Sequence, residues 1–555
     1  MTKKTFFRLL LIIIAVNFIG LFGDIFMQDS SLYAVISKSF SVSNDYINIY
    51  VNGNDWLDKP HFLFWLCAVF IELFGNTSFA YKLPSFLFFI LGMIYTYKIS
   101  KKLYNTEIAY ISTLILGSSF HIFLSNNDVR AEAILLGLIM GASYYLYNLK
   151  LNFTVKNLFL SAVFLAASVM TKGIFILIIP FSALFFDMLL KKELKDNFNV
   201  KWLLVFILTF IFIIPEIYAV YNQFDLHPEK VVFGKKNVSG MKFLFWDSQF
   251  GRFFNNGPIK GKGDITFFIH TMIWSFAPWT IIGFSSLVIR CKNLLTRKGR
   301  GGINESFTFF GFLILFIVFS LSKFQLPHYI NIIYPFIAIT TAALIYNSRK
   351  KWVRKLLKLS INFYSVAFLL SIVFIEYFFR TERLVVSLSI ILVLLILIIY
   401  VNIKVSKYNF LILAILSISL FFVFLNMAFY PKLLKYQSGS QVAFYINKYY
   451  PKDDIIVSFN DWLLQYYTKN DLYNVRTIGE LKSKIQDKNI ILVADKTFFA
   501  DIKKSTLDFE VLKIFESYSI TRLKSDFIYY KTREKTLSYN YLIEVKTFAN
   551  NVYSK

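Results

Sequence analysis

The chain has 555 residues, of which 56% are hydrophobic and 19% aromatic, and it carries a formal net charge of +26. No soluble domain of this length needs so much apolar surface, so the composition excludes a soluble globular protein. The charge does not require nucleic acid as a partner, because membrane topology and attraction to anionic membrane lipids account for it.

Apolar segments long enough to cross about 30 Å of hydrocarbon recur from Phe6 to about residue 429. The first follows Lys3, Lys4 and Arg8, but no small-residue cleavage site follows it, so we interpret it as a membrane helix and not as a signal peptide. We predict thirteen transmembrane helices, at about residues 6–23, 80–97, 107–125, 131–148, 155–171, 173–190, 202–221, 265–288, 306–323, 329–346, 359–379, 384–403 and 409–429.

Lysine and arginine are concentrated in alternate loops between these segments. The positive-inside rule therefore places the N-terminus and these basic loops on the cytoplasmic side. An odd number of helices then places the C-terminal segment outside. The basic loops lie near residues 98–102, 150–156, 191–201, 290–300, 349–358 and 404–407.

Three longer segments fall on the outer side. Residues 24–79 contain two amphipathic pieces, 30–40 and 59–75, whose aromatic residues suit the headgroup layer. The second segment is the loop 222–264. The third is the tail from Pro431, where a helix pattern at 439–450 alternates with strand patterns at 454–460 and 489–495. We predict an all-α polytopic membrane domain (1–430), with interfacial helices in the first outer loop, and a small C-terminal α/β soluble domain (431–555).

The first outer segment has an unusual set of charges for a connecting loop. Asp29 opens the first amphipathic piece, and Asp58 and Lys59 precede Pro60 at the start of the second. Two carboxylates and an ammonium at one membrane surface could deprotonate a nucleophile, bind a divalent cation or hold a phosphate. The alternative is that these carboxylates only solvate the loop, with Asp29 capping a helix.

The order of several short motifs resembles a known family. Asp29 and Tyr33 form Asp-x-x-x-Tyr in QDSSLYA, and LDKPHFLFW (57–65) follows about 25 residues later. LFG…FAYKLPS (73–85), TKG (171–173) and SKFQLPHY…YP (322–335) come next. This order resembles the polytopic polyprenyl-phosphate-sugar glycosyltransferases of the GT-C superfamily, which include the lipid A aminoarabinose transferases and the protein O-mannosyltransferases. The resemblance covers about residues 5–345.

The resemblance implies roles for individual residues. Asp29 matches the catalytic aspartate of the first outer loop, but Ser30 replaces the glutamate that usually follows, so a bound divalent metal stays undecided. Asp58 stands where the aminoarabinose branch has glutamate, as a second catalytic candidate, and Lys59 matches the lysine assigned to the carrier phosphate. Further substrate-binding candidates are Tyr33, Arg130 near Asp128 and Glu132, Lys172 at a separate helix end, Arg252 in the second outer loop, and His328.

Each of these further candidates has a simpler interpretation. A lone lysine or arginine at a helix end often extends only to the membrane interface. Asp128, Arg130 and Glu132 could form a local salt bridge.

The implied reaction is the transfer of a sugar from a polyprenyl-phosphate carrier to lipid A, another glycan or a protein, with inversion at the anomeric carbon. It would take place at the periplasmic face of a bacterial inner membrane and would require no nucleotide. The Gly-rich GRGG (299–302) lacks the spacing of a phosphate-binding loop and is predicted to be a turn.

Two other functions are compatible with a polytopic chain. A secondary transporter would need charged or broken helices near mid-bilayer, and the predicted helices have few charges at their centres. A polymerase or ligase of O-antigen chains would share the lipid-linked donor, but its catalytic cations would lie in a large late outer loop. Residues 431–555 show no catalytic constellation of their own and could have a structural or receptor role.

Overall fold

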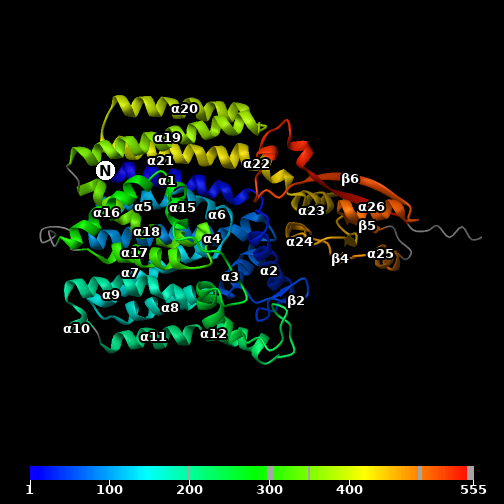
Figure 1. Ribbon diagram of the computed structural model, residues 1–555, viewed down its shortest axis with the longest axis horizontal. Helices are drawn as coiled ribbons and strands as arrows, with labels where there is room; N and C mark the ends of the chain where they lie inside the picture. Colours follow the sequence, from blue (N-terminus) through cyan, green and yellow to red (C-terminus); the bar gives the residue numbers. More distant parts are fainter. Residues whose placement is uncertain (198, 297–304, 348–349, 486–489, 547–555) are drawn as a thin grey trace, which may run out of the picture.

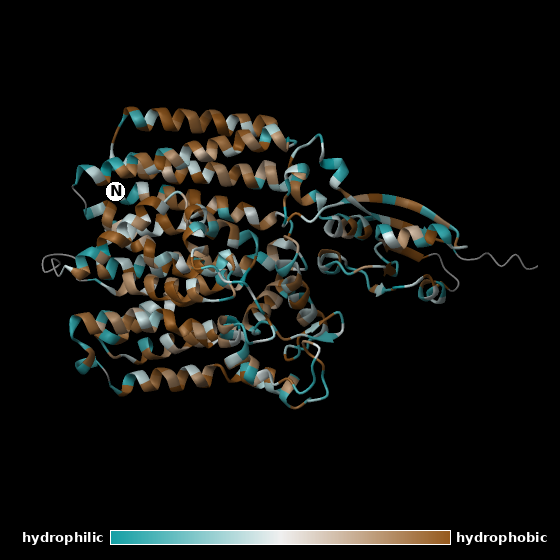
Figure 2. Cartoon of the chain, in the orientation of Figure 1, coloured by the Kyte–Doolittle hydropathy of each residue, from teal (hydrophilic) through white to brown (hydrophobic). Residues whose placement is uncertain are grey.

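The structure is a computed structural model that describes residues 1–197, 199–296, 305–347, 350–485 and 490–546. It consists of a bundle of roughly aligned helices, from one end of which the C-terminal part of the chain projects (Figure 1). Apolar residues cover the helices along their length, and polar residues gather at their ends and in the projecting part (Figure 2). This distribution is the one that a lipid bilayer selects, because helices satisfy their own backbone hydrogen bonds in hydrocarbon.

Among the described residues, nine helical segments are long and apolar enough to cross a membrane. Several consist of an α-helix continued by a short turn of 3-10 or π-helix. They are α1 (Lys3–Ile19) with η1 (Gly20–Phe22), α4 (Ser78–Leu103), α7 (Ala131–Leu151), α8 (Val155–Lys172), η2 (Ile174–Leu177) with α9 (Ile178–Lys191), η5 (Pro327–Ile333) with α18 (Tyr334–Asn347), α19 (Lys351–Phe378), α20 (Leu384–Ile403), and α21 (Lys407–Phe424) with η6 (Leu425–Phe429), α22 (Tyr430–Leu433) and η7 (Leu434–Tyr436).

Two bent pairs bring the number in the described chain to eleven if each pair is one span. The first is α5 (Thr106–Gly117) with α6 (Phe120–Asn127), bent by 54°. The second is α11 (Val200–Phe212) with α12 (Ile214–Val220) and η3 (Tyr221–Asp225), bent by 43°. A short helix, α10 (Leu194–Asn197), precedes α11.

The described residues contain nine such spans, or eleven with the two bent pairs, which is fewer than the thirteen predicted. The segment predicted at 265–288 is interrupted around Pro278 and forms α15 (Phe267–Ser275) and α16 (Thr280–Leu295). The segment predicted at 306–323 forms α17 (Phe307–Leu321), which has only 15 residues. Hydropathy averaged over a window does not detect a break within an apolar segment or the short length of a helix. Each of these two segments was therefore predicted to span the membrane. Nine and eleven are also odd, and the N-terminus lies at the end of the bundle opposite the C-terminal part (Figure 1). The predicted turn at 299–302 lies outside the described residues.

The first outer segment contains the two predicted amphipathic helices, α2 (Asp29–Ser43) and α3 (Phe62–Phe74). Between them, β1 (Tyr50–Val51) and β2 (Asn54–Asp55) form a small antiparallel hairpin. Its turn residues, Asn52 and Gly53, both have positive φ, as two-residue hairpin turns require. In the second outer segment the structure has short helical turns: α13 (Gly240–Lys242), η4 (Phe243–Gly251) and α14 (Arg252–Phe254).

The C-terminal part is the predicted α/β domain. Its five-stranded mixed sheet has the order β4-β3-β5-β7-β6, in which β4, β3 and β5 are parallel and β7 pairs antiparallel with both β5 and β6. The elements are α23 (Ser438–Tyr449), β3 (Ile455–Val457), α24 (Trp462–Tyr467), β4 (Leu472–Asn474), α25 (Ile478–Lys484), β5 (Ile490–Ala494), α26 (Lys496–Lys504), β6 (Phe509–Ser517), α27 (Ser525–Ile528), η8 (Arg533–Thr536) and β7 (Ser538–Val545).

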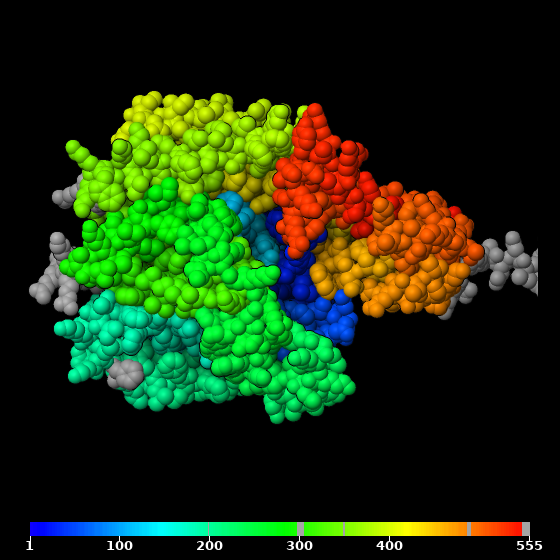
Figure 3. Space-filling model, in the orientation of Figure 1, coloured from blue at the N-terminus to red at the C-terminus, as the bar shows by residue number. Residues whose placement is uncertain are grey.

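This domain is attached to the stretch of chain that leads into α2. The side chain of Gln437 accepts a hydrogen bond from the Met27 backbone N–H (2.7 Å) and donates one to the Ile25 carbonyl (2.9 Å). The Lys38 ammonium on α2 donates to the carbonyls of Gln465 and Thr468 beside α24 (2.8 and 2.7 Å). The first outer segment therefore lies between the bundle, the second outer segment and the C-terminal domain (Figure 3).

Candidate active site

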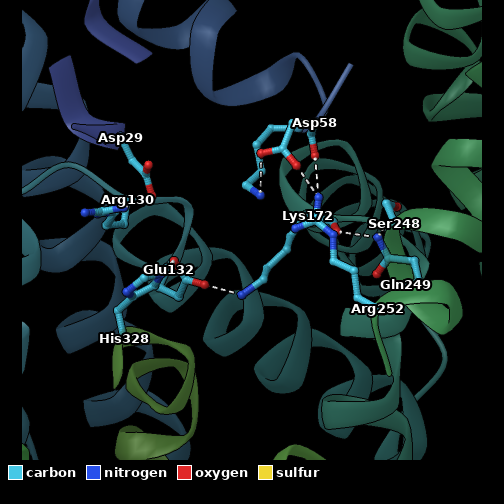
Figure 4. A network of polar contacts seen from close by, with 10 residues as sticks. Asp29, Asp58, Arg130, Glu132, Lys172, Ser248, Gln249, Arg252 and His328 are labelled. Carbon is cyan, nitrogen blue, oxygen red and sulfur yellow. Dashed lines mark hydrogen bonds and ion pairs between the residues drawn. The ribbon is translucent and has the colours of Figure 1, made fainter. Parts of the chain in front are cut away.

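Charged side chains from six parts of the chain meet in one network (Figure 4), close to α2 and α3 at the end of the bundle that carries the C-terminal domain (Figure 1). Asp29 is the first residue of α2, and Asp58 and Lys59 precede α3. The others come from helix ends: Arg130 and Glu132 at the start of α7, Lys172 at the end of α8, Arg252 at the start of α14, and His328 in η5.

Every carboxylate of this group faces a cation. Asp29 forms an ion pair with Arg130, which also binds Asp128 (Nε to Oδ2, 3.0 Å). Asp58 forms ion pairs with Lys59 (Nζ to Oδ2, 3.0 Å) and with Arg252.

Glu132 forms an ion pair with Lys172, and its second oxygen lies 3.8 Å from Nε2 of His328. Only 2% of the Glu132 side chain is exposed, so its charge depends on these partners.

The ion pairs change the protonation behaviour of the outer loop. Burial alone would raise the pKa of Asp58, but Lys59 and Arg252 outweigh it and lower that pKa. Burial lowers the pKa of Lys59, although Asp58 opposes the shift. For Arg130, burial would lower the pKa, but Asp128 and Asp29 together raise it. Asp58 and Arg130 are therefore held in their charged forms.

Two adjoining cavities open beside these residues. The first, which we call the aromatic cavity, has an empty volume of about 620 Å³, and its walls include Phe175, Phe253 and Phe319. The second, the Asp29 cavity, has about 650 Å³, and its walls include Asp29, Tyr33 and Arg130. Both cavities share one wall, formed by Asp58, Lys59, Lys172, Arg252, Phe324 and Tyr329.

The shared wall is held in place by contacts around it. The Lys172 ammonium lies 3.7 Å from the centre of the Tyr329 ring, and the Lys172 carbonyl accepts a hydrogen bond from Gln249 (2.9 Å). Arg252 also donates to the Asp58 carbonyl (3.3 Å), but its buried Nε has no hydrogen-bond partner. Four cations and three carboxylates line the Asp29 cavity, so with His328 neutral the wall carries an excess positive charge that suits an anion.

A divalent cation does not fit this arrangement. Ser30 adds no carboxylate beside Asp29, and the carboxylate of Asp29 is already paired with Arg130. In the described part of the chain, no group of three or more His, Cys, Asp or Glu residues is placed to hold a metal ion. The donor set favours a phosphate over a metal.

Comparison with known proteins gives the fold. Crystal structures of ArnT from Cupriavidus metallidurans match with a TM-score of 0.73 over 100% of both chains when that protein is bound to undecaprenyl phosphate, and 0.72 over 97% of both chains in its apo state. The sequence identities are 15% and 16%. The chain has the ArnT fold. This result confirms the predicted fold class.

Sequence comparisons agree with the ArnT fold. Residues 58–218 match the family model of dolichyl-phosphate-mannose-protein mannosyltransferases. An uncharacterized protein of Aquifex aeolicus is 27% identical over 361 residues, which are 64% of this chain and 66% of that protein. The undecaprenyl phosphate-alpha-4-amino-4-deoxy-L-arabinose arabinosyl transferase of Wigglesworthia glossinidia brevipalpis is 23% identical over 359 residues, 64% of this chain and 60% of the relative. The aligned part thus spans less than two thirds of either relative.

On this ArnT fold, all eight residues predicted for the site line the Asp29 cavity: Asp29, Tyr33, Asp58, Lys59, Arg130, Lys172, Arg252 and His328. Lys172 lies at the end of a separate helix, α8, and belongs to the wall that both cavities share. Asp29 is not the N-cap of α2, because Gln28 occupies that position. Their chemical roles stay predictions.

Sequence reasoning missed several residues of the site. Of the cluster Asp128, Arg130 and Glu132, for which a local salt bridge was the alternative interpretation, Arg130 pairs with Asp128, whereas Glu132 pairs with Lys172 and lies near His328. Phe324 and Tyr329 line both cavities, and both belong to the SKFQLPHY motif, which could have indicated them. Asp55 pairs with Lys230 (2.9 Å) and does not line either cavity.

Proposed function

We propose that this chain is an integral-membrane glycosyltransferase that moves a sugar from a polyprenyl-phosphate carrier, such as undecaprenyl phosphate, to an acceptor. The observation that carries the proposal is the shared cationic wall between an aromatic cavity and a cavity containing a half-exposed carboxylate. Such an arrangement separates a lipid-phosphate donor from its acceptor while keeping both next to the same phosphate-binding cations.

The donor would bind on the aromatic side. Its apolar chain would lie along the phenylalanines of the aromatic cavity, and its phosphate would bind Lys59, Arg252 and Lys172. The unpartnered Nε of Arg252 supplies a donor for such a phosphate oxygen. As the bond between the sugar and the phosphate breaks, these cations would stabilise the negative charge that develops on the leaving group.

The acceptor would bind in the Asp29 cavity. Asp29 would take the proton from the acceptor hydroxyl or orient that group, while Arg130 holds the carboxylate in position. The acceptor oxygen would form a bond to the anomeric carbon from the side opposite the phosphate, and the phosphate would leave with the electron pair of the broken bond. This single displacement inverts the anomeric carbon.

Sidedness and domain roles belong to the same proposal. The distribution of basic residues in the loops supports a site at the periplasmic face of a bacterial inner membrane. Residues 1–430 would hold the chemistry, and residues 431–555 would cover the site and fix the entrance to α2. The acceptor would be lipid A, another glycan or a protein. The charged residues lie at or beside helix ends, as a transferase at the membrane surface requires, whereas a transporter would need them at mid-bilayer.

Sugar transfer from a polyprenyl-phosphate donor by the purified, reconstituted chain tests this function. Mass spectrometry of lipid A and surface glycans from cells with and without the chain would identify the acceptor and the added mass. We expect a mass increase of one sugar on one acceptor class, and Lys59→Ala should reduce the rate at which that product forms. Turnover that required a nucleotide sugar instead would overturn the proposal.

A further inference from the structure

A third cavity lies at the opposite end of the bundle, between α1, α4 and α5. It has an empty volume of about 1070 Å³ and is lined mainly by apolar side chains of α1 and α4. Phe7 and Ile94 are 52% and 42% exposed on its walls, so it opens toward the surface that faces lipid. We call it the α1–α4 groove.

The length of the groove fits one leaflet of a bilayer. Its lining runs from Lys3 to Ile14 on α1 and from Lys101 back to Ile90 on α4. Each run covers about 16 Å at 1.5 Å per residue, close to half of the roughly 30 Å hydrocarbon core. An acyl chain entering from the membrane surface would therefore fill the groove to about mid-bilayer.

The charged groups of the groove lie at its mouth, whereas the hydroxyl of Thr113 lies deeper and donates to the Ala109 carbonyl (2.8 Å). Lys3 and Lys101 stand on its two sides, and neither forms an ion pair among the described residues. Tyr97 and Tyr110 stack beside Phe6, and neither hydroxyl has a hydrogen-bond partner in the described chain.

Among the described residues that line the groove, none carries a carboxylate. The nearest one along the chain, Glu107, is already paired with the Met1 amino group (2.9 Å) and with the Tyr408 hydroxyl (3.3 Å). The mouth thus offers the ammonium groups of Lys3 and Lys101 and the hydroxyls of Tyr97, Thr106 and Tyr110 to an anionic headgroup.

We propose that the α1–α4 groove is a binding site for one anionic diacyl phospholipid of the leaflet opposite the candidate active site. One acyl chain would fill the apolar part, and the phosphate would bind Lys3 and Lys101. The bound lipid would brace α1 against α4 at this end of the bundle. At the other end, the Lys82 ammonium of α4 already joins them by donating to the carbonyls of Gly20 (3.2 Å), Gly23 (2.8 Å) and Asp24 (3.2 Å).

Thermal unfolding of the delipidated full-length protein in detergent tests this site. Adding dioleoylphosphatidylglycerol should raise the unfolding midpoint more than dioleoylphosphatidylcholine does, because a ligand that binds only the folded state stabilises it. In the Lys3→Ala/Lys101→Ala variant, the anionic lipid should bind roughly thirtyfold more weakly, at about 1 kcal/mol per lysine and about 1.4 kcal/mol per decade.

Two further variants separate the groove from general attraction between basic surfaces and anionic lipid. Lys351→Ala/Lys355→Ala removes two exposed lysines at the same end of the bundle and should leave the preference unchanged. Ile94→Trp keeps both groove lysines but fills the apolar channel, and should abolish the preference. Equal shifts with both lipids, equal losses in the two lysine variants, or a full preference in Ile94→Trp would each overturn the proposal and leave ordinary boundary lipid as the explanation.

Discussion

Asp29 combines two properties that a catalytic carboxylate at this position needs. Its side chain is 51% exposed and lines the Asp29 cavity, and the ion pair with Arg130 fixes its orientation. It lies within α2 and not at its N-cap, so helix capping does not explain it. Asp29, the aspartate of the Asp-x-x-x-Tyr motif, is therefore also the half-exposed carboxylate of the Asp29 cavity.

Asp29→Asn should reduce sugar transfer by about 10²–10⁴, the usual contribution of a general base, because it removes the charge and keeps the size. Folding should survive, since Arg130 retains Asp128 as a partner. The measurement is transfer from a polyprenyl-phosphate donor by purified variants, with the unfolding temperature as control. A fully active Asp29→Asn protein would remove Asp29 from the mechanism.

Lys59 and Lys172 both belong to the wall that the two cavities share, but they differ in how much the folded structure depends on their ion pairs. Lys59→Ala leaves Asp58 paired with Arg252, so donor use should fall ten- to hundredfold, as expected for a charge-assisted phosphate contact of about 1.5–3 kcal/mol, with little loss of stability. Lys172→Ala leaves the buried Glu132 with only His328 and should also destabilise the fold by about 3 kcal/mol.

The double variant Lys172→Met/Glu132→Gln separates the role of Lys172 in stability from its role in binding the donor phosphate. It removes the unpaired charge, so stability should return while donor use stays impaired. Unfolding midpoints and donor KM measured side by side check this. If the double variant recovered both, Lys172 would have no part in phosphate binding.

At the scale of elements, contacts of His61 hold the loop that contains Asp58 and Lys59 in position. The His61 backbone N–H and ring Nδ1 both contact the Glu216 carboxylate of α12 (3.0 Å each), and Nε2 contacts the Ile47 carbonyl (3.0 Å). His61 is 1% exposed and Glu216 is fully buried. A carbonyl oxygen only accepts hydrogen bonds, so Nε2 carries a proton.

Glu216→Gln keeps the size of this residue but weakens the contact to the ring. We expect a loss of about 1–3 kcal/mol in unfolding free energy, because a buried polar group loses part of its pairing. Donor KM should rise as Lys59 loses its fixed position, whereas binding of an acceptor analogue should change little. A stability loss with unchanged donor KM would show that the pair supports only the fold.

Some elements around the site could be predicted from the sequence, and others could not. The amphipathic helices that contain Asp29 and follow Lys59 were predictable, because local periodicity and Pro60 determine them. The hairpin between them was missed although Asn52-Gly53 is a strong two-residue turn signal. The pairing of Glu132 with Lys172 was not predictable, since the two residues are 40 positions apart and no local pattern joins them. The break near Pro278, between α15 and α16, was not predicted because hydropathy averaged over a window does not detect it.

For the whole molecule, sidedness can be measured directly. Cys67 is buried and Cys291 is exposed, so single cysteines should be introduced in a Cys291→Ser background. An impermeant thiol reagent applied to intact spheroplasts should label Asn52→Cys and Lys469→Cys, which are exposed in the first outer segment and the C-terminal domain. Lys351→Cys, exposed at the opposite end, should react only after the cells are opened. The reverse pattern would invert the proposed topology.

The wall shared by the two cavities has a kinetic consequence. Neither cavity has to be emptied before the other is filled, and the proposed reaction forms no covalent bond to the protein, so donor and acceptor should form a ternary complex. Double-reciprocal plots of initial rates should then intersect instead of running parallel. The released lipid phosphate would still occupy Lys59, Lys172 and Arg252, and it should inhibit competitively against the donor but not against the acceptor. Parallel plots would indicate a sugar held on the protein between two half-reactions.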